Sequence, residues 1–253
     1  MQTILDSATT AGLLLFGRYA FPPNRFGYCG SDDHASLFAY ITGEEVDGGL
    51  AELARKFEGA YPYLKLIAGA NNIRDPFDPR VVEAYWLGND YLERVAPSAF
   101  YDSLKERFAA RMTNHAFSWL ATGLESGSKP HHNFHVFDVY RRAGLVRDGH
   151  ATIALDRMDQ CRISWGRVLL VEEAAVVVQR SPLEVRSGKI ALGSPQPVRL
   201  LRRIDGRGYA EGLEVGDVVS LHWDWVCERL TATKMRRLVA NTRRAIANTN
   251  LTL

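Results

Sequence analysis

The segments Cys161-Arg-Ile-Ser-Trp-Gly166 and Gly216-Asp-Val-Val-Ser-Leu-His222 bracket the part of the chain that decides the fold. Between them lie short runs of β-branched or alternating residues, separated by glycine, proline, serine or acidic turns. This spacing is typical of a small β-barrel rather than of a βαβ sheet. The predicted strands span residues 162–171, 174–180, 183–185, 189–192, 197–204 and 218–223.

The chain before about residue 150 has the periodicity of α-helices instead. Apolar residues recur at three- and four-residue spacing over residues 50–67, and Pro62 inside this pattern predicts a break near Tyr61. The pairs Asp78-Pro79 and Pro97-Ser98 each place a proline where a further helix would begin. The N-terminal part is therefore predicted to be helical.

Two further segments complete the prediction. Residues 21–33 are rich in proline and glycine, which predicts a loop. Thr231 is a suitable N-cap for a basic amphipathic helix that ends near residue 247. We therefore predict an α+β chain, with an α-helical domain at residues 1–150 and a small OB-like β-barrel with a C-terminal helix at residues 151–253.

The composition excludes several classes of protein. The 253 residues are 46% hydrophobic and 24% charged, with a formal net charge of +2, so the total charge does not indicate a nucleic-acid surface. We find no apolar run long enough to span a membrane and no signal peptide, and therefore expect no membrane partner. Three cysteines argue against a disulfide framework and favour a reduced, cytoplasmic protein.

Cys161 and His222 stand at the two ends of the predicted barrel. A soft thiolate and an imidazole brought together would suit a borderline or soft metal ion. The alternative is that Cys161 is a buried strand cysteine and His222 a histidine of the core or of an interface. Both interpretations remain open at this point.

The chain from Cys161 to its C-terminus resembles the HypC/HupF family, the small chaperones of NiFe-hydrogenase maturation. That family begins with Cys-x-x-x-x-Gly and later carries a Gly-Asp-x-Val-x-Val-His strand followed by a helix. The matching residues are Cys161, Gly166, Val168, Gly216, Asp217, Val219, Leu221 and His222, followed by Glu228 and Leu230. The pattern departs from the family at Trp165, where the family has proline, and at Cys161, which is internal.

The resemblance implies a function for these residues. It implies that Cys161 and His222 hold an iron fragment that carries cyanide and carbonyl ligands, and that this cargo is delivered to the large subunit of the hydrogenase. The hydrogenase large subunit or other maturation proteins would then be the partners.

The segment Pro130-His131-His132-Asn133-Phe134-His135 is the densest group of histidines. If it opens a helix, His131 and His135 share one face at a spacing that suits metal ligation, and His132 points elsewhere. The early loop offers candidates for a third ligand, which are Cys29, Asp32, Asp33 and His34. The alternative is a group of capping and hydrogen-bonding histidines at a domain boundary.

The segment His222-Trp-Asp-Trp-Val-Cys227 is rich in aromatic residues. On a continuous strand, His222 and Asp224 would share one face, so that Asp224 could orient the imidazole. The tryptophans of the other face would form a docking surface or pack at the seam between the two halves.

We therefore expect a metal-cofactor maturation accessory that carries or transfers iron. The alternatives are a metal-dependent enzyme with a His/Cys site in the helical half, and a non-catalytic interaction scaffold. Because no long flexible linker separates the halves, we also expect them to pack together. The segment 131–135 or the Cys29 loop should then lie near Cys161 and His222 and form one composite site.

Overall fold

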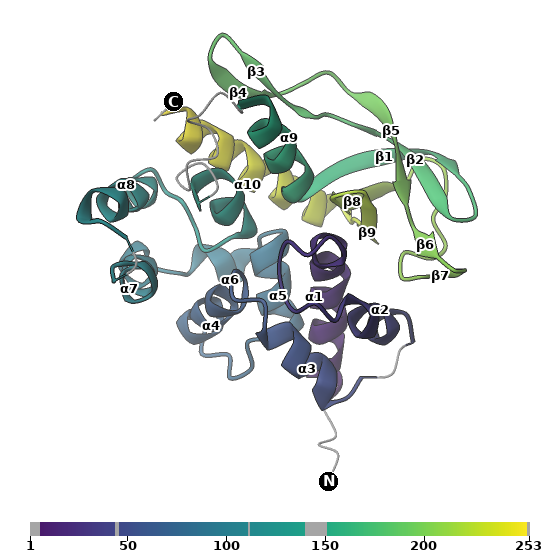
Figure 1. Ribbon diagram of the computed structural model, residues 1–253, viewed down its shortest axis with the longest axis horizontal. Coiled ribbons are helices and arrows are strands. Elements are labelled where there is room, and N and C mark those ends of the chain that lie inside the picture. Colours follow the sequence, from purple (N-terminus) through teal and green to yellow (C-terminus); the bar gives the residue numbers. More distant parts are fainter. Residues whose placement is uncertain (1–5, 44–45, 111, 140–150, 252–253) are drawn as a thin grey trace.

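The computed structural model describes residues 6–43, 46–110, 112–139 and 151–251, which fold into a helical part and a strand-rich part that lie side by side (Figure 1). The first helices are α1 (Ser7–Arg25), α2 (His34–Gly43), α3 (Gly48–Arg55), α4 (Tyr61–Ala70), α5 (Pro79–Trp86), α6 (Asp90–Glu93), α7 (Pro97–Phe108) and α8 (Asn114–Glu125). A π-helix, η1 (Phe134–Val139), and α9 (Ala151–Cys161) precede the strands.

Several helix boundaries confirm the sequence predictions. The pattern over residues 50–67 is divided between α3 and α4, and α4 begins at Tyr61 with Pro62 in its first turn, where proline is tolerated. The carboxylate of Asp78 accepts a hydrogen bond of 2.9 Å from the backbone N–H of Arg80 and caps α5. Helix α7 begins at Pro97 as predicted.

The loop predicted for residues 21–33 is wrong in its first part. Helix α1 continues through Pro22 and Pro23 and ends at Arg25. Proline lacks the N–H that would bond to the carbonyl four residues earlier, so a sequence pattern with two prolines argues against a helix. Here both prolines are buried, and the carbonyls that they leave free bond to the barrel, as described below.

The strand-rich part is a five-stranded barrel of the OB type. Its strands are β1 (Ser164–Val171), β2 (Ala175–Arg180), β5 (Gln196–Leu201), β8 (Val218–His222) and β9 (Trp225–Arg229). They pair in the order β1-β2-β5-β9-β8, and β8 returns to pair with β1. The contact between β5 and β9 is one parallel pair, Leu201 with Trp225, so this is the weakest seam. The OB-fold is a partly open five-stranded Greek-key barrel. With helices before this barrel and one after it, the α+β prediction is confirmed.

Two small hairpins and one helix complete the chain. The hairpins are β3 (Leu183–Arg186) with β4 (Lys189–Leu192), and β6 (Arg203–Ile204) with β7 (Arg207–Gly208). Helix α10 (Ala232–Asn250) follows, and the Thr231 hydroxyl caps it by accepting from the Lys234 N–H.

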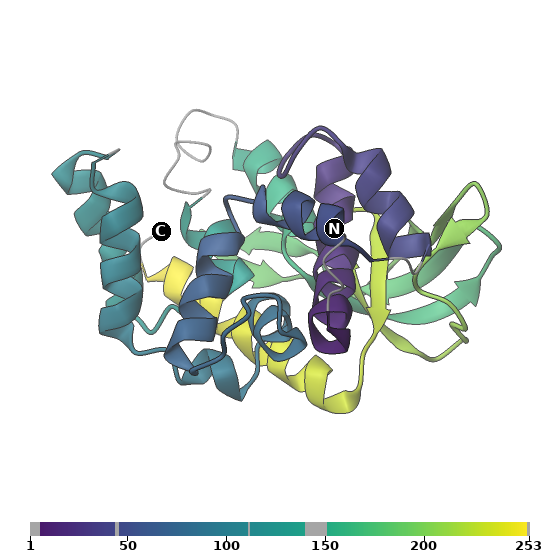
Figure 2. The ribbon, with the colours of Figure 1, turned by 90° about the horizontal axis from the view of Figure 1, so that it is seen from below.

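Helix α10 connects the two parts rather than packing on the barrel alone. In Figure 2 it runs from the barrel end along the helical part (yellow). Arg237 and Arg244 form ion pairs with Asp90 and Glu93 at the two ends of α6. Its C-terminal Asn250 bonds to the β3–β4 hairpin instead.

The hydrophobic core also crosses the boundary near residue 150. Phe16 and Trp86 of the helical part belong to the same buried cluster as Ile163, Trp225 and Leu238. The two halves therefore pack against each other, as the missing linker predicted. Among the described residues, no helix has the length and apolar character that crossing a membrane requires.

Candidate metal centre

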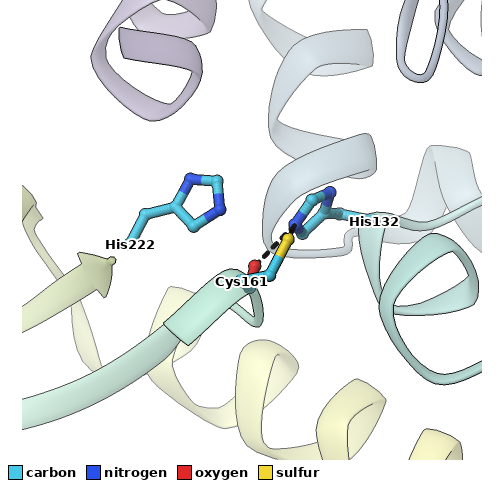
Figure 3. A group of neighbouring side chains, drawn as sticks. All are labelled: His132, Cys161 and His222. Atoms are coloured by element: carbon cyan, nitrogen blue, oxygen red, sulfur yellow. Dashed lines mark hydrogen bonds between the residues drawn. The ribbon is translucent and has the colours of Figure 1, made fainter. Parts of the chain in front are cut away.

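His132, Cys161 and His222 converge at the seam between the helical part and the barrel. One potential ligand atom from each lies within 4.8 Å of the others, and Figure 3 shows the three side chains pointing toward one another. Each residue is at most 5% exposed. The predicted proximity of the histidine segment to Cys161 and His222 is confirmed, whereas metal binding stays a prediction.

The ring of His222 is fixed by a carbonyl of α1. Nδ1 lies 2.6 Å from the carbonyl oxygen of Tyr19, and because a carbonyl can only accept, Nδ1 carries the hydrogen. The lone pair is therefore on Nε2, which has no hydrogen-bond partner among the described residues. The Cys161 carbonyl lies near enough to raise the pKa, but burial dominates and lowers the pKa of His222 to about 4. An Nδ1–H held by a carbonyl is the usual support of a metal-ligating histidine.

The two prolines of α1 make this support possible. In a regular helix the N–H groups of residues 22 and 23 would bond to the carbonyls of Arg18 and Tyr19. Proline has no N–H, so both carbonyls are free to accept from the barrel. The Tyr209 hydroxyl donates to the Arg18 carbonyl at 3.0 Å, and His222 uses that of Tyr19.

The side chain of Tyr19 fixes α1 further against the barrel. Its hydroxyl lies 2.8 Å from Ser220 Oγ on β8 and donates to Glu228 on β9 at 2.7 Å. The Tyr19 carbonyl is therefore held in place by the same strand pair that carries His222. Sequence analysis did not find Tyr19, and the consecutive prolines after it were the available signal.

Cys161 is the last residue of helix α9, whereas the sequence analysis placed it at the start of the barrel. Helical periodicity before it is weak, so this helix was missed. Asp159, two residues earlier, accepts from Arg162 Nε at 2.9 Å and from the Leu183 N–H at 2.8 Å, and it also pairs with Arg180. This buried ionic network fixes the end of α9 against the barrel and thus positions the thiol.

His132, rather than the predicted pair of His131 and His135, provides the imidazole nearest to Cys161. Its Nε2 lies 2.8 Å from the Cys161 carbonyl and 3.9 Å from Sγ, and its Nδ1 lies 3.4 Å from the Tyr85 hydroxyl. The expectation that His132 points elsewhere is wrong because His131 precedes the helical residues, which begin at His132, and Phe134–Val139 form a π-helix. The i, i+4 rule for an α-helix therefore does not apply here.

His131 lies on the opposite side of this segment. Its Nδ1 accepts a hydrogen bond of 3.0 Å from the Asn133 N–H, and its side chain lines a separate cavity. His135 remains on the Cys161 side, and its ring centroid is 6.2 Å from that of His132.

A cavity of about 40 Å³ lies beside the three converging side chains. It exceeds the roughly 10–15 Å³ that one water molecule needs. Its walls are mainly apolar or aromatic, and Cys29 and His135 are further potential ligands in them. The residues around it are Pro23, Tyr28, Cys29, Phe57, Gly59, Ala60, Tyr85, Trp86, His132, His135, Cys161 and His222.

The other candidates from the early loop do not reach the cavity. Asp32, Asp33 and His34 are exposed. The Asp33 carboxylate instead caps α2, where it accepts a hydrogen bond of 3.1 Å from the Ser36 N–H. Of the residues proposed in this loop, the cavity is lined by Cys29 alone.

The structure also corrects the role expected for Asp224. Strand β8 ends at His222, and Trp223 and Asp224 form the turn to β9, so the strand is not continuous. The Asp224 carboxylate accepts from Arg25 at 2.6 Å rather than from His222. Trp223 has a positive φ of 54° and stacks on Tyr28, with 4.4 Å between the ring centroids.

The electrostatics of the cluster favour neutral imidazoles. Burial lowers the pKa of His132 well below its usual value and that of His135 to about 4. A cysteine nucleophile requires a thiolate, which a nearby imidazolium or other cation usually stabilises. These imidazoles resist protonation, so the arrangement does not suit a thiolate–imidazolium pair. A metal ion, in contrast, binds neutral imidazole and supplies the charge that stabilises a thiolate.

The fold and the site together define an α+β protein with an OB-type barrel and a buried cluster of two histidines and one cysteine. A protein family described as "Family of unknown function (DUF6390)" matches residues 8–253, and the chain therefore belongs to this family. No curated protein and no solved structure matches the chain.

Proposed function

We propose that the protein is a metal-binding protein whose ion is held by His132, Cys161 and His222. The observation that carries this proposal is the convergence of three buried donor atoms within 4.8 Å. Mixed nitrogen and sulfur ligands favour zinc, iron or copper over magnesium or calcium. The Tyr19 carbonyl already directs the lone pair of His222 Nε2 toward the other two residues.

His132 can adapt to a metal ion through Tyr85. In the structure its Nε2 faces the Cys161 carbonyl and therefore carries the hydrogen. Ligation through Nε2 requires that the hydrogen move to Nδ1, which then donates to the Tyr85 oxygen. The Tyr85 hydroxyl can in turn donate to the Gly59 carbonyl, which lies 3.4 Å away. Both tautomers of His132 thus have hydrogen-bond partners.

Metal analysis of purified variants tests this proposal. The wild-type protein should contain one transition-metal ion per chain, and His132→Asn, His222→Asn and Cys161→Ser should each lose it. His131→Asn is the matched control, because its imidazole is equally buried but lines the other cavity. Equal metal content in all five proteins would contradict the proposal.

A second candidate function is that of a maturation accessory for NiFe hydrogenase in the cytoplasm. It is supported by the OB-type barrel and by the proximity of Cys161 and His222, the residues on which the HypC/HupF resemblance rests. None of the three cysteines forms a disulfide, which suits a reducing compartment. The burial of both residues, however, favours a resident ion over a cargo that is handed to a partner.

Infrared spectroscopy distinguishes the two functions. The protein isolated from a hydrogenase-producing host should show cyanide and carbonyl bands if it carries the iron fragment, and Cys161→Ala should abolish both these bands and hydrogenase activity. If the protein binds metal but shows no such bands, and the variant has normal hydrogenase activity, the maturation function is contradicted and the resident metal centre is supported.

A further inference from the structure

The net charge of the proposed three-ligand centre favours a fourth ligand that is anionic. A divalent ion, one thiolate and two neutral imidazoles have a combined charge of +1. A buried net charge costs free energy unless an opposite charge compensates it. All three residues of the cluster are buried. A second anionic ligand would make the centre neutral.

Two further donors line the same cavity, and they differ in charge. His135 would bind as a neutral ligand and leave the centre at +1. Cys29 would bind as a thiolate and make the centre neutral, and its side chain lines the same cavity as that of Cys161.

We propose that Cys29 is the fourth ligand, so that the centre is a closed Cys2His2 site fitted to zinc. This inference rests on the proposed metal-binding function. Structural zinc sites have four protein ligands, whereas catalytic sites keep one position open. A divalent ion would deprotonate the Cys29 thiol on binding.

The loop that carries Cys29 is held toward the cavity. Asn24 is 2% exposed, and its Nδ2 donates hydrogen bonds of 2.6 Å to the carbonyls of both Cys29 and Ser31. Gly30 has a φ of +80°, and a Cβ there would lie 2.5 Å from the Phe57 ring, so the loop packs closely on Phe57, which follows α3. Cys29 is not one of the three residues whose ligand atoms lie within 4.8 Å, so its side chain must turn inward on binding.

A closed centre of this kind would connect the two parts of the molecule. Cys29 and His132 precede residue 150, while Cys161 and His222 follow it. Binding would therefore stabilise the packing of the helical part on the barrel, since metal-binding free energy at a site formed by folding is also folding free energy.

Cobalt(II) loading of the full-length protein tests the ligand set. The sulfur-to-cobalt charge-transfer band grows with the number of thiolates, so Cys29→Ser should show about half the wild-type intensity per bound ion. Cys227→Ala is the matched control, because this third cysteine is buried away from the cavity and should leave the band unchanged. Cys29→His should recover affinity for cobalt while the band stays at about half, which separates ligation from a general effect on folding.

X-ray absorption on the zinc form provides the decisive count. Two sulfur neighbours in the wild type and one in Cys29→Ser would support the proposal. A full charge-transfer band in Cys29→Ser, together with its loss in Cys161→Ser, would overturn the role of Cys29 while the three-residue centre stands. A wild-type protein that takes up neither cobalt nor zinc would contradict the metal centre itself.

Discussion

The adjacent histidines His131 and His132 lie in two different cavities on either side of one short segment. Both are buried, and burial lowers the pKa of both imidazoles, to about 3 for His131. Around His132 are a thiol and a second imidazole, whereas the cavity of His131 is lined by amides, by the Asp138 carboxylate and by the cations of Lys129 and Arg244. Burial and a shifted pKa therefore do not distinguish a metal site, whereas the convergence of soft donors does.

The largest loss of stability is expected from breaking the buried ion pairs of Asp159, which fix the end of α9 beside the Cys161 cavity. Asp159→Ala would leave Arg162, which is 1% exposed, without its ionic partner. Breaking a buried pair in this way destabilises proteins by about 3–5 kcal/mol. Chemical denaturation should show this loss, whereas removing the exposed pair partner Glu172, bound to Arg199, should change stability by at most about 1 kcal/mol. Equal effects of the two substitutions would contradict the role assigned to Asp159.

The effect of metal removal on the melting temperature should distinguish variants in the two cavities. A ligand at about 1,000 times its Kd stabilises a folded protein by about 4 kcal/mol, so chelation should lower the melting temperature of the wild type. His131→Asn should show the same metal-dependent shift, because its cavity does not take part. His132→Asn should melt at one temperature with and without chelator. A metal-dependent shift in His132→Asn that matches the wild type would place the ion elsewhere.

Acid should lower the stability of the metal-free protein through the buried histidines of both cavities. The folded pKa of His222 is about 4 and that of His131 about 3, while an unfolded histidine titrates near 6.5. Between these values the unfolded state binds more protons, so stability is complete above pH 6.5 and falls as the pH decreases toward 4. Each histidine contributes a slope of about 1.4 kcal/mol per pH unit.

Denaturation of the apoprotein at several pH values checks this slope. His131→Asn and His222→Asn should each reduce the pH dependence by one proton. With metal present, stability should fall more steeply on acidification in the wild type, because protons then compete with the ion for the ligands. A flat profile between pH 6.5 and 4.5 would contradict the buried neutral state of these imidazoles.

Much of the fold could be predicted from short stretches of sequence, because helix caps and strand alternation depend on interactions between residues close together in the chain. The Asp78-Pro79 pair and Thr231 begin helices through bonds within one turn, and the alternating segments after Cys161 pair into the predicted barrel. The continuation of α1 through Pro22 and Pro23 could not be predicted, because the lost hydrogen bonds are replaced by donors from Tyr209 and His222, which lie 191 and 203 positions from the carbonyls that accept from them.

The sequence predicted the location of the cluster and two of its three residues, Cys161 and His222, but placed His131 and His135 where the structure has His132. The missing linker indicated that Cys161 and His222 would meet the histidine segment. The choice between His131 and His132 depended on the local backbone, because His131 precedes the helical residues and the segment from Phe134 is a π-helix rather than an α-helix. The prediction that Asp224 orients His222 assumed a continuous strand, and it is wrong because the chain turns at Trp223, with a positive φ that a tryptophan rarely adopts.

The smallest expected effect concerns two buried asparagines, one beside each cavity. Neither amide atom of Asn133, near His131, has a hydrogen-bond partner among the described residues, whereas Asn24 holds the Cys29 loop through two carbonyls. Removing an unpartnered buried amide recovers its desolvation cost, so Asn133→Leu should stabilise the protein by about 1 kcal/mol and leave metal content unchanged. Asn24→Leu, in contrast, should destabilise the protein by a similar amount and weaken metal binding. Denaturant titration and metal analysis of the two variants measure both quantities, and a loss of stability in Asn133→Leu as large as in Asn24→Leu would show that the His131 cavity is as fully hydrogen-bonded as the Cys29 loop.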